Sequence, residues 1–193
     1  MTRPEETAEN AEGAKKYLSL RSLRSPVSSS YVITMHLAQV NIGRMKAPLD
    51  DPSMAGFVSR LAELNALADG SDGFVWRMQD GEGSGNTYLR PFDDDRIIVN
   101  MSVWETVEQL RAYTYSGPHA EILRQRRDWF EKFDRVAVAL WWVPAGHVPT
   151  MDEAKQRLAS LDAHGPTPFA FTFKTLFPPD DHKIAHPATQ SSI

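Results

Sequence analysis

The order of strand and helix signals along the chain predicts an α+β fold, in which a β-α-β-β-α-β unit is followed by one more helix and strand. Three observations predict it: short apolar runs rich in β-branched residues, helical stripes between some of them, and capping or turn residues at the junctions. With 193 residues, of which 41% are hydrophobic, the chain is long enough to bury one sizeable core.

The first half of this unit reads as strand, helix, strand. Residues 31–40, YVITMHLAQV, are apolar and carry no helical stripe, which predicts a buried strand. The stripe that predicts the following helix consists of Phe57, Leu61, Leu64 and Ala68. Residues 73–78, GFVWRM, predict a short second strand, and the Gly- and Asp-rich stretch 79–95 predicts a long loop.

The second half reads as strand, helix, strand again. Residues 96–104, RIIVNMSVW, predict the third strand, and 105–133 predict a helical region that is interrupted at SGP, 116–118. Residues 135–143, RVAVALWWV, predict the fourth strand. These six elements follow the order of the ferredoxin-like split βαβ unit.

One more helix and strand are predicted after this unit. Thr150 and Glu153 form a capping box that begins the helix, and Gly165 ends it. In 169–174, FAFTFK, phenylalanines alternate with smaller residues, which predicts a half-buried fifth strand.

The folded domain is predicted to span 30–177, with flexible tails at 1–29 and 178–193 that carry few large apolar residues. Within the first tail, only 17–23 could form a short docking helix.

Composition excludes several classes of function. The chain has no cysteine, so it has no disulfide, thiolate nucleophile or Cys-ligated metal. The formal net charge of −4 argues against a nucleic-acid partner. No apolar run is long enough for a membrane span and the N-terminal residues are acidic, so a cytoplasmic protein without a membrane partner is expected.

Two adjacent tryptophans in the fourth strand must point to opposite faces of the sheet. A ferredoxin-like sheet carries its helices on one face, so a ligand, a second sheet or a partner subunit has to cover the other. We therefore expect a homodimer through the open sheet face. Trp141 is in phase with Ala137 and Ala139, whose small side chains leave room for a pocket, so Trp141 is predicted to line it and Trp142 to pack in the core.

The third strand presents a mixed face made of Ile98, Asn100, Ser102 and Trp104. Because a buried polar group needs a partner, this face predicts the wall of a ligand cavity. Two alternatives remain open: Asn100 and Ser102 satisfy loop backbone, or Ser102 caps the next helix.

His119 lies on the apolar stripe of Ile122, Leu123 and Phe130. Such an imidazole can be a base or a haem ligand, or a core histidine bonded to a carbonyl. His36, inside the first strand, is a similar candidate, and His147 lies in a loop where a turn or capping role is equally expected. No histidines or carboxylates have metal-ligand spacing, so no metal site is predicted.

Basic residues cluster in RQRRDW, 124–129. Interleaved carboxylates, with Arg127 and Glu131 as an i,i+4 pair, favour a solvated helix face. The alternative is an arginine, Arg127, at the cavity mouth that binds a carboxylate-bearing ligand. The glycine-rich GEGSG, 81–85, lacks the lysine of a phosphate loop and predicts a flexible hairpin or lid.

Several segments together resemble the family called domain of unknown function 3291, over roughly 33–175: HLAQVNIGR, GFVWRM, VNMSVWETVEQLRAYTYSGPH, RRDWF and LWWVPAGHVPTMDEAKQRLASLDAHGPTPFAFTF. That family is placed in the dimeric α/β-barrel superfamily. The resemblance implies ferredoxin-like subunits that pair sheet to sheet, each with a pocket lined by a helix histidine and polar strand residues.

Relatives in that superfamily include cofactor-free antibiotic-biosynthesis monooxygenases, haem-degrading enzymes, chlorite dismutases and small dehydratases. The segment from Trp104 to the SGPH break is similar to the corresponding helix of the monooxygenase-like members, so Trp104 and His119 are the residues that the resemblance carries over.

The resulting prediction is a monooxygenase-like enzyme that needs no cofactor and acts on an aromatic or polyketide-like substrate. His119 would be the general base, and Asn100 would hydrogen-bond the oxyanion. The substrate would contact His36, Ser102, Trp104, Tyr113, Arg127 and Trp141. The alternative is a non-catalytic dimeric binder of an aromatic or haem-like ligand, although no second haem-ligating group or other haem signature is recognisable.

Overall fold

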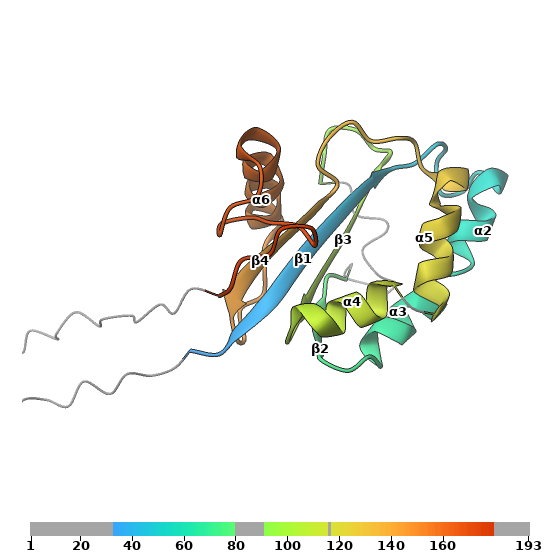
Figure 1. Ribbon diagram of the computed structural model, residues 1–193. Helices are drawn as coiled ribbons and strands as arrows, with labels where there is room; N and C mark the ends of the chain where they lie inside the picture. Colours follow the sequence, from blue (N-terminus) through green and yellow to red (C-terminus); the bar gives the residue numbers. More distant parts are fainter. Residues whose placement is uncertain (1–32, 80–90, 116, 180–193) are drawn as a thin grey trace, which may run out of the picture. The chain divides into compact units, whose positions relative to one another are not determined.

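A four-stranded antiparallel sheet organises the part of the chain that the computed structural model describes, residues 33–79, 91–115 and 117–179 (Figure 1). Its strand order is β2-β3-β1-β4, which is the ferredoxin-like order. The predicted sequence of the first six elements is therefore confirmed. The strands are β1 (Met35–Arg44), β2 (Phe74–Arg77), β3 (Ile97–Trp104) and β4 (Val138–Pro144).

The helices connect these strands as expected for an α+β fold. Between β1 and β2 lie η1 (Pro52–Met54), α2 (Ala55–Val58) and α3 (Leu61–Asp69), and between β3 and β4 lie α4 (Val107–Tyr115) and α5 (Gly117–Trp129). After β4 comes α6 (Met151–His164), whose capping box at Thr150 and Glu153 is formed as predicted. No helix among the described residues is long and apolar enough to cross a membrane.

The predicted fifth strand is wrong. Residues 167–175 form two tight turns, since Thr167 hydrogen-bonds with Ala170 and Thr172 with Thr175. This segment touches the outer edge of the sheet at one bridge, where Leu140 and Phe171 exchange N–H···O bonds of 2.8 and 2.9 Å. Backbone groups that are satisfied within local turns cannot extend a ladder, so the alternating phenylalanines do not make a strand.

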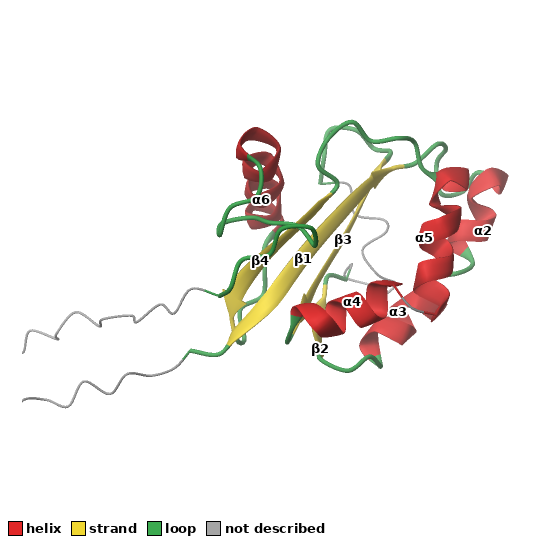
Figure 2. Ribbon diagram, viewed as in Figure 1, coloured by secondary structure: helices red, strands yellow, loops and turns green. Residues whose placement is uncertain are grey.

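Both faces of the sheet are covered, which corrects the expectation of one open face (Figure 2). α6 packs against one face through Ala154, Leu158 and Leu161, while α4 and α5 lie on the other side. The physical reason is that the apolar stripe of α6 needs a partner surface, and the apolar face of the sheet supplies it. The homodimer was expected because one face of the sheet was expected to be open. Since both faces are covered, the homodimer remains a prediction that this observation no longer supports.

The two tryptophans of β4 do point to opposite faces, but their roles are reversed. Trp141 is fully buried beneath α6, and its Nε1 donates to Glu153 Oε1 at 3.1 Å. Trp142 is half-buried on the α4 side, and its Nε1 donates to the Phe177 carbonyl at 2.8 Å. The placement of Trp141 in a pocket is wrong, because the indole and α6 together fill the space above Ala38 and Ala139.

The predicted tail 1–29, most of the predicted tail 178–193 and the segment 81–85 lie outside the described residues. The predictions made for them are not tested by the structure.

Replacing each tryptophan by alanine tests the assignment of the two faces. Trp141→Ala removes a fully buried ring and should lower the free energy of unfolding by roughly 3–5 kcal/mol. Trp142→Ala should cost less, since its ring is only half-buried. Urea unfolding followed by circular dichroism measures both, and Trp141→Phe, which keeps a ring but loses the bond to Glu153, should lie between wild type and Trp141→Ala. A larger loss for Trp142→Ala would contradict the assignment.

Candidate functional site

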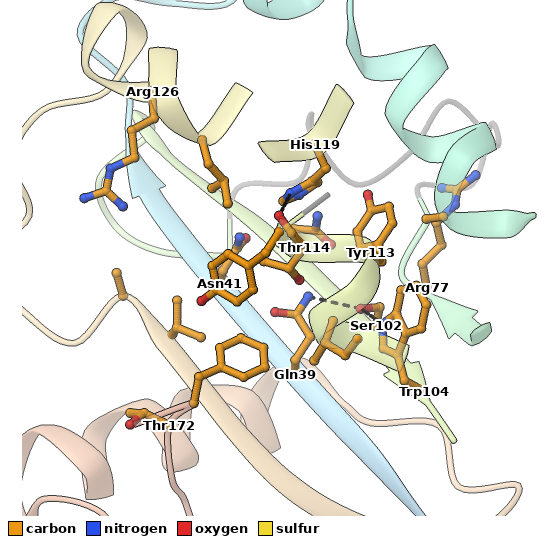
Figure 3. Close-up of a pocket in the computed structure, with 18 of the residues that line it drawn as sticks. Gln39, Asn41, Arg77, Ser102, Trp104, Tyr113, Thr114, His119, Arg126 and Thr172 are labelled. Carbon is orange, nitrogen blue, oxygen red and sulfur yellow. Dashed lines mark hydrogen bonds between the residues drawn. The ribbon is translucent and has the colours of Figure 1, made fainter. Parts of the chain in front are cut away.

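A cavity of about 810 Å³ lies between the sheet and the helices α4 and α5, with residues 172–174 along one side (Figure 3). Its volume is within the range of small-molecule sites. The sheet supplies its floor, the helices supply its roof, and Figure 3 shows Gln39, Asn41 and Ser102 on the sheet side, opposite Tyr113 and His119. We call this cavity the pocket.

The floor of the pocket is polar because β1 and β3 pair in a particular register. Gln39 lies opposite Ser102, and Asn41 lies opposite Asn100. The hydroxyl oxygen of Ser102 accepts hydrogen bonds from Gln39 Nε2 at 3.1 Å and from Trp104 Nε1 at 2.9 Å. Ser102 thus bonds side chains of the pocket floor rather than a helix end, and the helix-cap alternative is wrong.

The amides of Asn41 and Asn100 are the free part of this floor. Neither side chain hydrogen-bonds any of the residues that the structure describes, and Asn100 is exposed to the pocket. An amide offers both N–H donors and a carbonyl acceptor. The floor can therefore hydrogen-bond a ligand oxygen without breaking an existing bond.

Three rings lie in contact along one wall of the pocket. Trp104 and Tyr113 are stacked with ring centroids 5.1 Å apart, and the Tyr113 and His119 rings are 4.7 Å apart. The Tyr113 hydroxyl donates to the Leu64 carbonyl at 3.3 Å. Burial raises the pKa of Tyr113 to about 12, so this ring stays protonated and serves as a neutral surface rather than as a base.

His119 owes its position to the break between the two helices. Gly117 adopts a positive φ of 54°, which ends the course of α4, and Pro118 follows in the first turn of α5. The last carbonyls of α4 have no partner within that helix. One of them, Thr114 O, lies 2.9 Å from His119 Nδ1 (Figure 3).

This contact determines the tautomer of His119. A carbonyl only accepts, so Nδ1 carries the proton, and in the neutral ring Nε2 keeps its lone pair. Burial lowers the pKa of His119, although the bond to Thr114 opposes this shift. The neutral ring is thus favoured. His119 is bonded to a carbonyl, as a core histidine would be, but it also lines the pocket.

The structure brings together six of the eight predicted site residues and excludes two. Those that line the pocket are Asn100, Ser102, Trp104, Tyr113, His119 and Arg127. The two excluded residues are Trp141, which faces α6 as described above, and His36. The prediction that His36 lines the pocket is wrong, because His36 is in phase with Ala38 and Val40 on the α6 face of β1. His147 has the turn role that was one expectation: its backbone N–H donates to the Pro144 carbonyl at 3.0 Å, and its Nε2 lies 2.9 Å from Glu153 Oε2 beside the helix start.

The predicted ion pair between Arg127 and Glu131 is not formed. Glu131 instead binds Arg44 and also Arg96, the latter at 2.9 Å. Because Glu131 follows the end of α5, its carboxylate lies near Arg44 at the end of β1 and Arg96 before β3, and Arg127 lines the pocket without it.

Sequence reasoning missed several pocket residues. Gln39 and Asn41 alternate with Ala38 and Val40, so a two-residue period in β1 would have found the polar face that was read as uniformly buried. Lys174 could not be found, because its segment was predicted to be a strand.

Within the described part of the chain, no group of three His, Asp or Glu side chains could hold a metal ion. His119 is the only histidine among the described residues that line the pocket, and its Nε2 could serve as a single axial ligand to haem iron.

Comparison with known proteins adds a family and three solved structures. A family model described as domain of unknown function (DUF3291) matches residues 36–187. Among curated proteins, none matches the chain.

The solved structures are distant. A mutant of SnoaB, a cofactor-independent oxygenase from Streptomyces nogalater, is 18% identical, with 58% of this chain and 95% of that chain covered and a TM-score of 0.39. Unmutated SnoaB is 18% identical over 60% and 96% of the two chains, with a TM-score of 0.37. A conserved protein from Bacteroides thetaiotaomicron, called a possible oxidoreductase, is 12% identical over 57% and 97%, with a TM-score of 0.35. Likenesses this weak carry no argument about activity.

Removing the Ser102 hydroxyl tests the pocket floor. Ser102→Ala leaves the Trp104 N–H and the Gln39 amide without their acceptor, which should lower the free energy of unfolding by about 1–3 kcal/mol. Ser59→Ala, at an exposed serine that bonds only the Gly56 carbonyl, is the matched control and should have a smaller effect. Urea unfolding measures both, and equal losses would show that the hydrogen bonds to Ser102 do not stabilise the floor.

Proposed function

The chain belongs to the domain of unknown function (DUF3291) family, and we propose that it is a small-molecule enzyme that removes a proton from an aromatic or polyketide-like substrate, as a cofactor-independent oxygenase does. One observation carries the proposal. The Thr114 carbonyl holds the proton of His119 on Nδ1, so Nε2 has its lone pair free in a ring that burial keeps neutral. A half-buried neutral imidazole beside a cavity is suited to general-base catalysis.

The residues around His119 support this role. A flat substrate would lie against the ring of Tyr113, which the fully buried ring of Trp104 supports from behind, and His119 Nε2 would take a proton from an acidic C–H bond. The negative charge that develops moves to a substrate oxygen, which the free amide of Asn100 would stabilise with a hydrogen bond.

Oxygen would complete the reaction without a cofactor. The deprotonated substrate donates an electron to O₂, and recombination of the two radicals with a proton gives a hydroperoxide. Loss of water then leaves a carbonyl, so a CH₂ group and O₂ become C=O and H₂O. The substrate itself is the reductant, and the protein contributes the base, the oxyanion donor and a partly enclosed cavity.

A non-catalytic binder of an aromatic or haem-like ligand is the second candidate. The same Nε2 lone pair that suits a base also suits an iron ligand, which is the observation in its favour. Titration with haemin distinguishes it: axial ligation by His119 should give a sharp Soret band that His119→Ala removes. The enzyme proposal expects no such band.

Substitution of His119 tests the enzyme proposal. With an anthrone, whose CH₂ group is acidified by two rings and a carbonyl, wild-type protein should consume oxygen, and His119→Ala should lower kcat/KM by about 10²–10⁴-fold. His164→Ala is the control, since His164 is exposed and bonds only the Ser160 carbonyl. Circular dichroism checks folding. If His119→Ala destabilises the protein while activity per folded molecule is unchanged, His119 is a core histidine and the proposal fails.

The pH dependence gives an independent test of the base. Burial lowers the pKa of His119 below its ordinary value of 6.5, and only the neutral ring can accept a proton. The kcat/KM for oxygen uptake should therefore be constant above neutral pH and decline only as the pH falls through a value below 6.5. A midpoint above 6.5 would mean that the ring is charged more readily than this site allows, and that another group is the base.

A further inference from the structure

The charge of the pocket is opposite to that of the chain. The protein has a formal net charge of −4, but the charged residues that line the pocket among the described residues are all cations. They are Arg77, Arg124, Arg126, Arg127 and Lys174. Arg77 is neutralised by Asp69, to which it makes hydrogen bonds of 2.7 and 3.1 Å. The other four form what we call the cationic rim.

The arginines of the rim have no acidic partner among the described residues, although acidic residues are close in sequence. Glu121 accepts from Gln125 at 3.3 Å and lies 3.8 Å from Arg60, while Glu131 binds Arg44 and Arg96. No ion pair joins Arg124, Arg126 or Arg127 to a carboxylate within the part of the chain that the structure describes. These guanidinium groups are therefore free to bind something else.

Helix stabilisation does not account for the whole rim. Arg126 and Arg127 lie in the last turn of α5, where a cation interacts favourably with the helix dipole. Arg124 lies earlier in α5, and Lys174 comes from a different segment, yet both line the same pocket. Convergence of cations from two segments on one cavity indicates a ligand with negative charge.

We infer that the pocket binds a flat anion: a ligand whose ring system lies against the aromatic wall and whose oxyanion, a carboxylate or another acidic oxygen group, pairs with the cationic rim. The inference rests on the proposal that the pocket binds a small molecule. Arginine suits this task, because its planar guanidinium can form two parallel hydrogen bonds with an oxyanion.

The rim also extends along α5 away from His119. Arg126 and Arg127 follow His119 by seven and eight residues on one helix, and a rise of 1.5 Å per residue separates their backbones by about 10–12 Å along its axis. A ligand that contacts both His119 and this end of the rim would therefore lie along α5.

Two fluorescent probes that differ in charge test the inference with the full chain. The anionic probe is 1-anilinonaphthalene-8-sulfonate, and the neutral probe is N-phenyl-1-naphthylamine, which lacks the sulfonate. We expect wild-type protein to bind the anionic probe more tightly than the neutral probe. Added NaCl should weaken binding of the anionic probe only. The double variant Arg124→Gln/Arg127→Gln should lower affinity for the anion by about tenfold or more and change affinity for the neutral probe by less than about twofold.

A charge-matched variant and a blocked pocket are the controls. Lys132→Gln/Arg135→Gln removes the same charge at exposed residues that do not line the pocket, and it should leave both affinities unchanged. Asn100→Trp places an indole on the pocket floor and should reduce binding of both probes.

The outcomes separate the two proposals. If both probes bind with equal affinity and the rim variant changes neither, the anion inference is wrong and the small-molecule pocket stands. If the charge-matched variant weakens the anion as much as the rim variant does, or if the anion still binds to Asn100→Trp, the anion site is not in the pocket and the inference is also wrong. If neither probe binds saturably, the small-molecule pocket fails together with the inference.

Discussion

β1 and β3 pair so that Ala38 lies opposite Val103 while Gln39 lies opposite Ser102, and both the core and the pocket depend on this register. Successive residues of a strand point to opposite faces, so one register assembles an apolar face for α6 and a polar face for the pocket. A slip of one residue would exchange the two faces of β1. The hydrogen bond from Gln39 to Ser102 reinforces the pairing, because it joins β1 to β3 on the polar side.

The two faces of the sheet differ, since one packs against α6 in the core and the other forms the floor of the pocket. On the α6 side, the buried side chains of the sheet and the helix pack closely, with Trp141 and Ala154 fully buried. On the other side, α5 begins after the end of α4 at Gly117, which has a positive φ, and the pocket remains between the two helices and the strands. The helix break thus has two consequences, since it brings His119 against the carbonyl of Thr114 and directs α5 along the pocket.

The polar groups of the pocket are divided between those that hold the structure and those that remain available. Gln39 and Trp104 both donate to the Ser102 hydroxyl oxygen, and Tyr113 and His119 each donate one hydrogen bond to a backbone carbonyl. The side chains of Asn41 and Asn100, His119 Nε2 and the guanidinium groups of the cationic rim make no hydrogen bond or ion pair with the residues that the structure describes. Fixed aromatic walls with a few unengaged polar groups are typical of preorganised small-molecule sites.

The sequence by itself determined the elements whose signals are local. The capping box at Thr150 and Glu153, the division of the helical region and the order of the first four strands depend on neighbouring residues. The structure has the capping box and the strand order, and it divides the helical region into α4, which ends at Tyr115, and α5, which begins at Gly117. The alternation in β3 likewise predicted that Asn100, Ser102 and Trp104 share one face of the pocket. These features follow from backbone conformation and the two-residue period of a strand.

Only the tertiary structure decided which face each helix covers. Alternation shows that Trp141 and Trp142 point apart, but it does not say which of them meets α6, because both faces offer apolar surface. The 169–174 segment carries a strand pattern, yet its backbone is satisfied by local turns and a single bridge to β4. The cationic rim depends on long-range ion pairs in the same way: Glu131 binds Arg44 and Arg96, which are distant in sequence, and so leaves Arg127 free. Such choices depend on competition between distant partners, which no local pattern records.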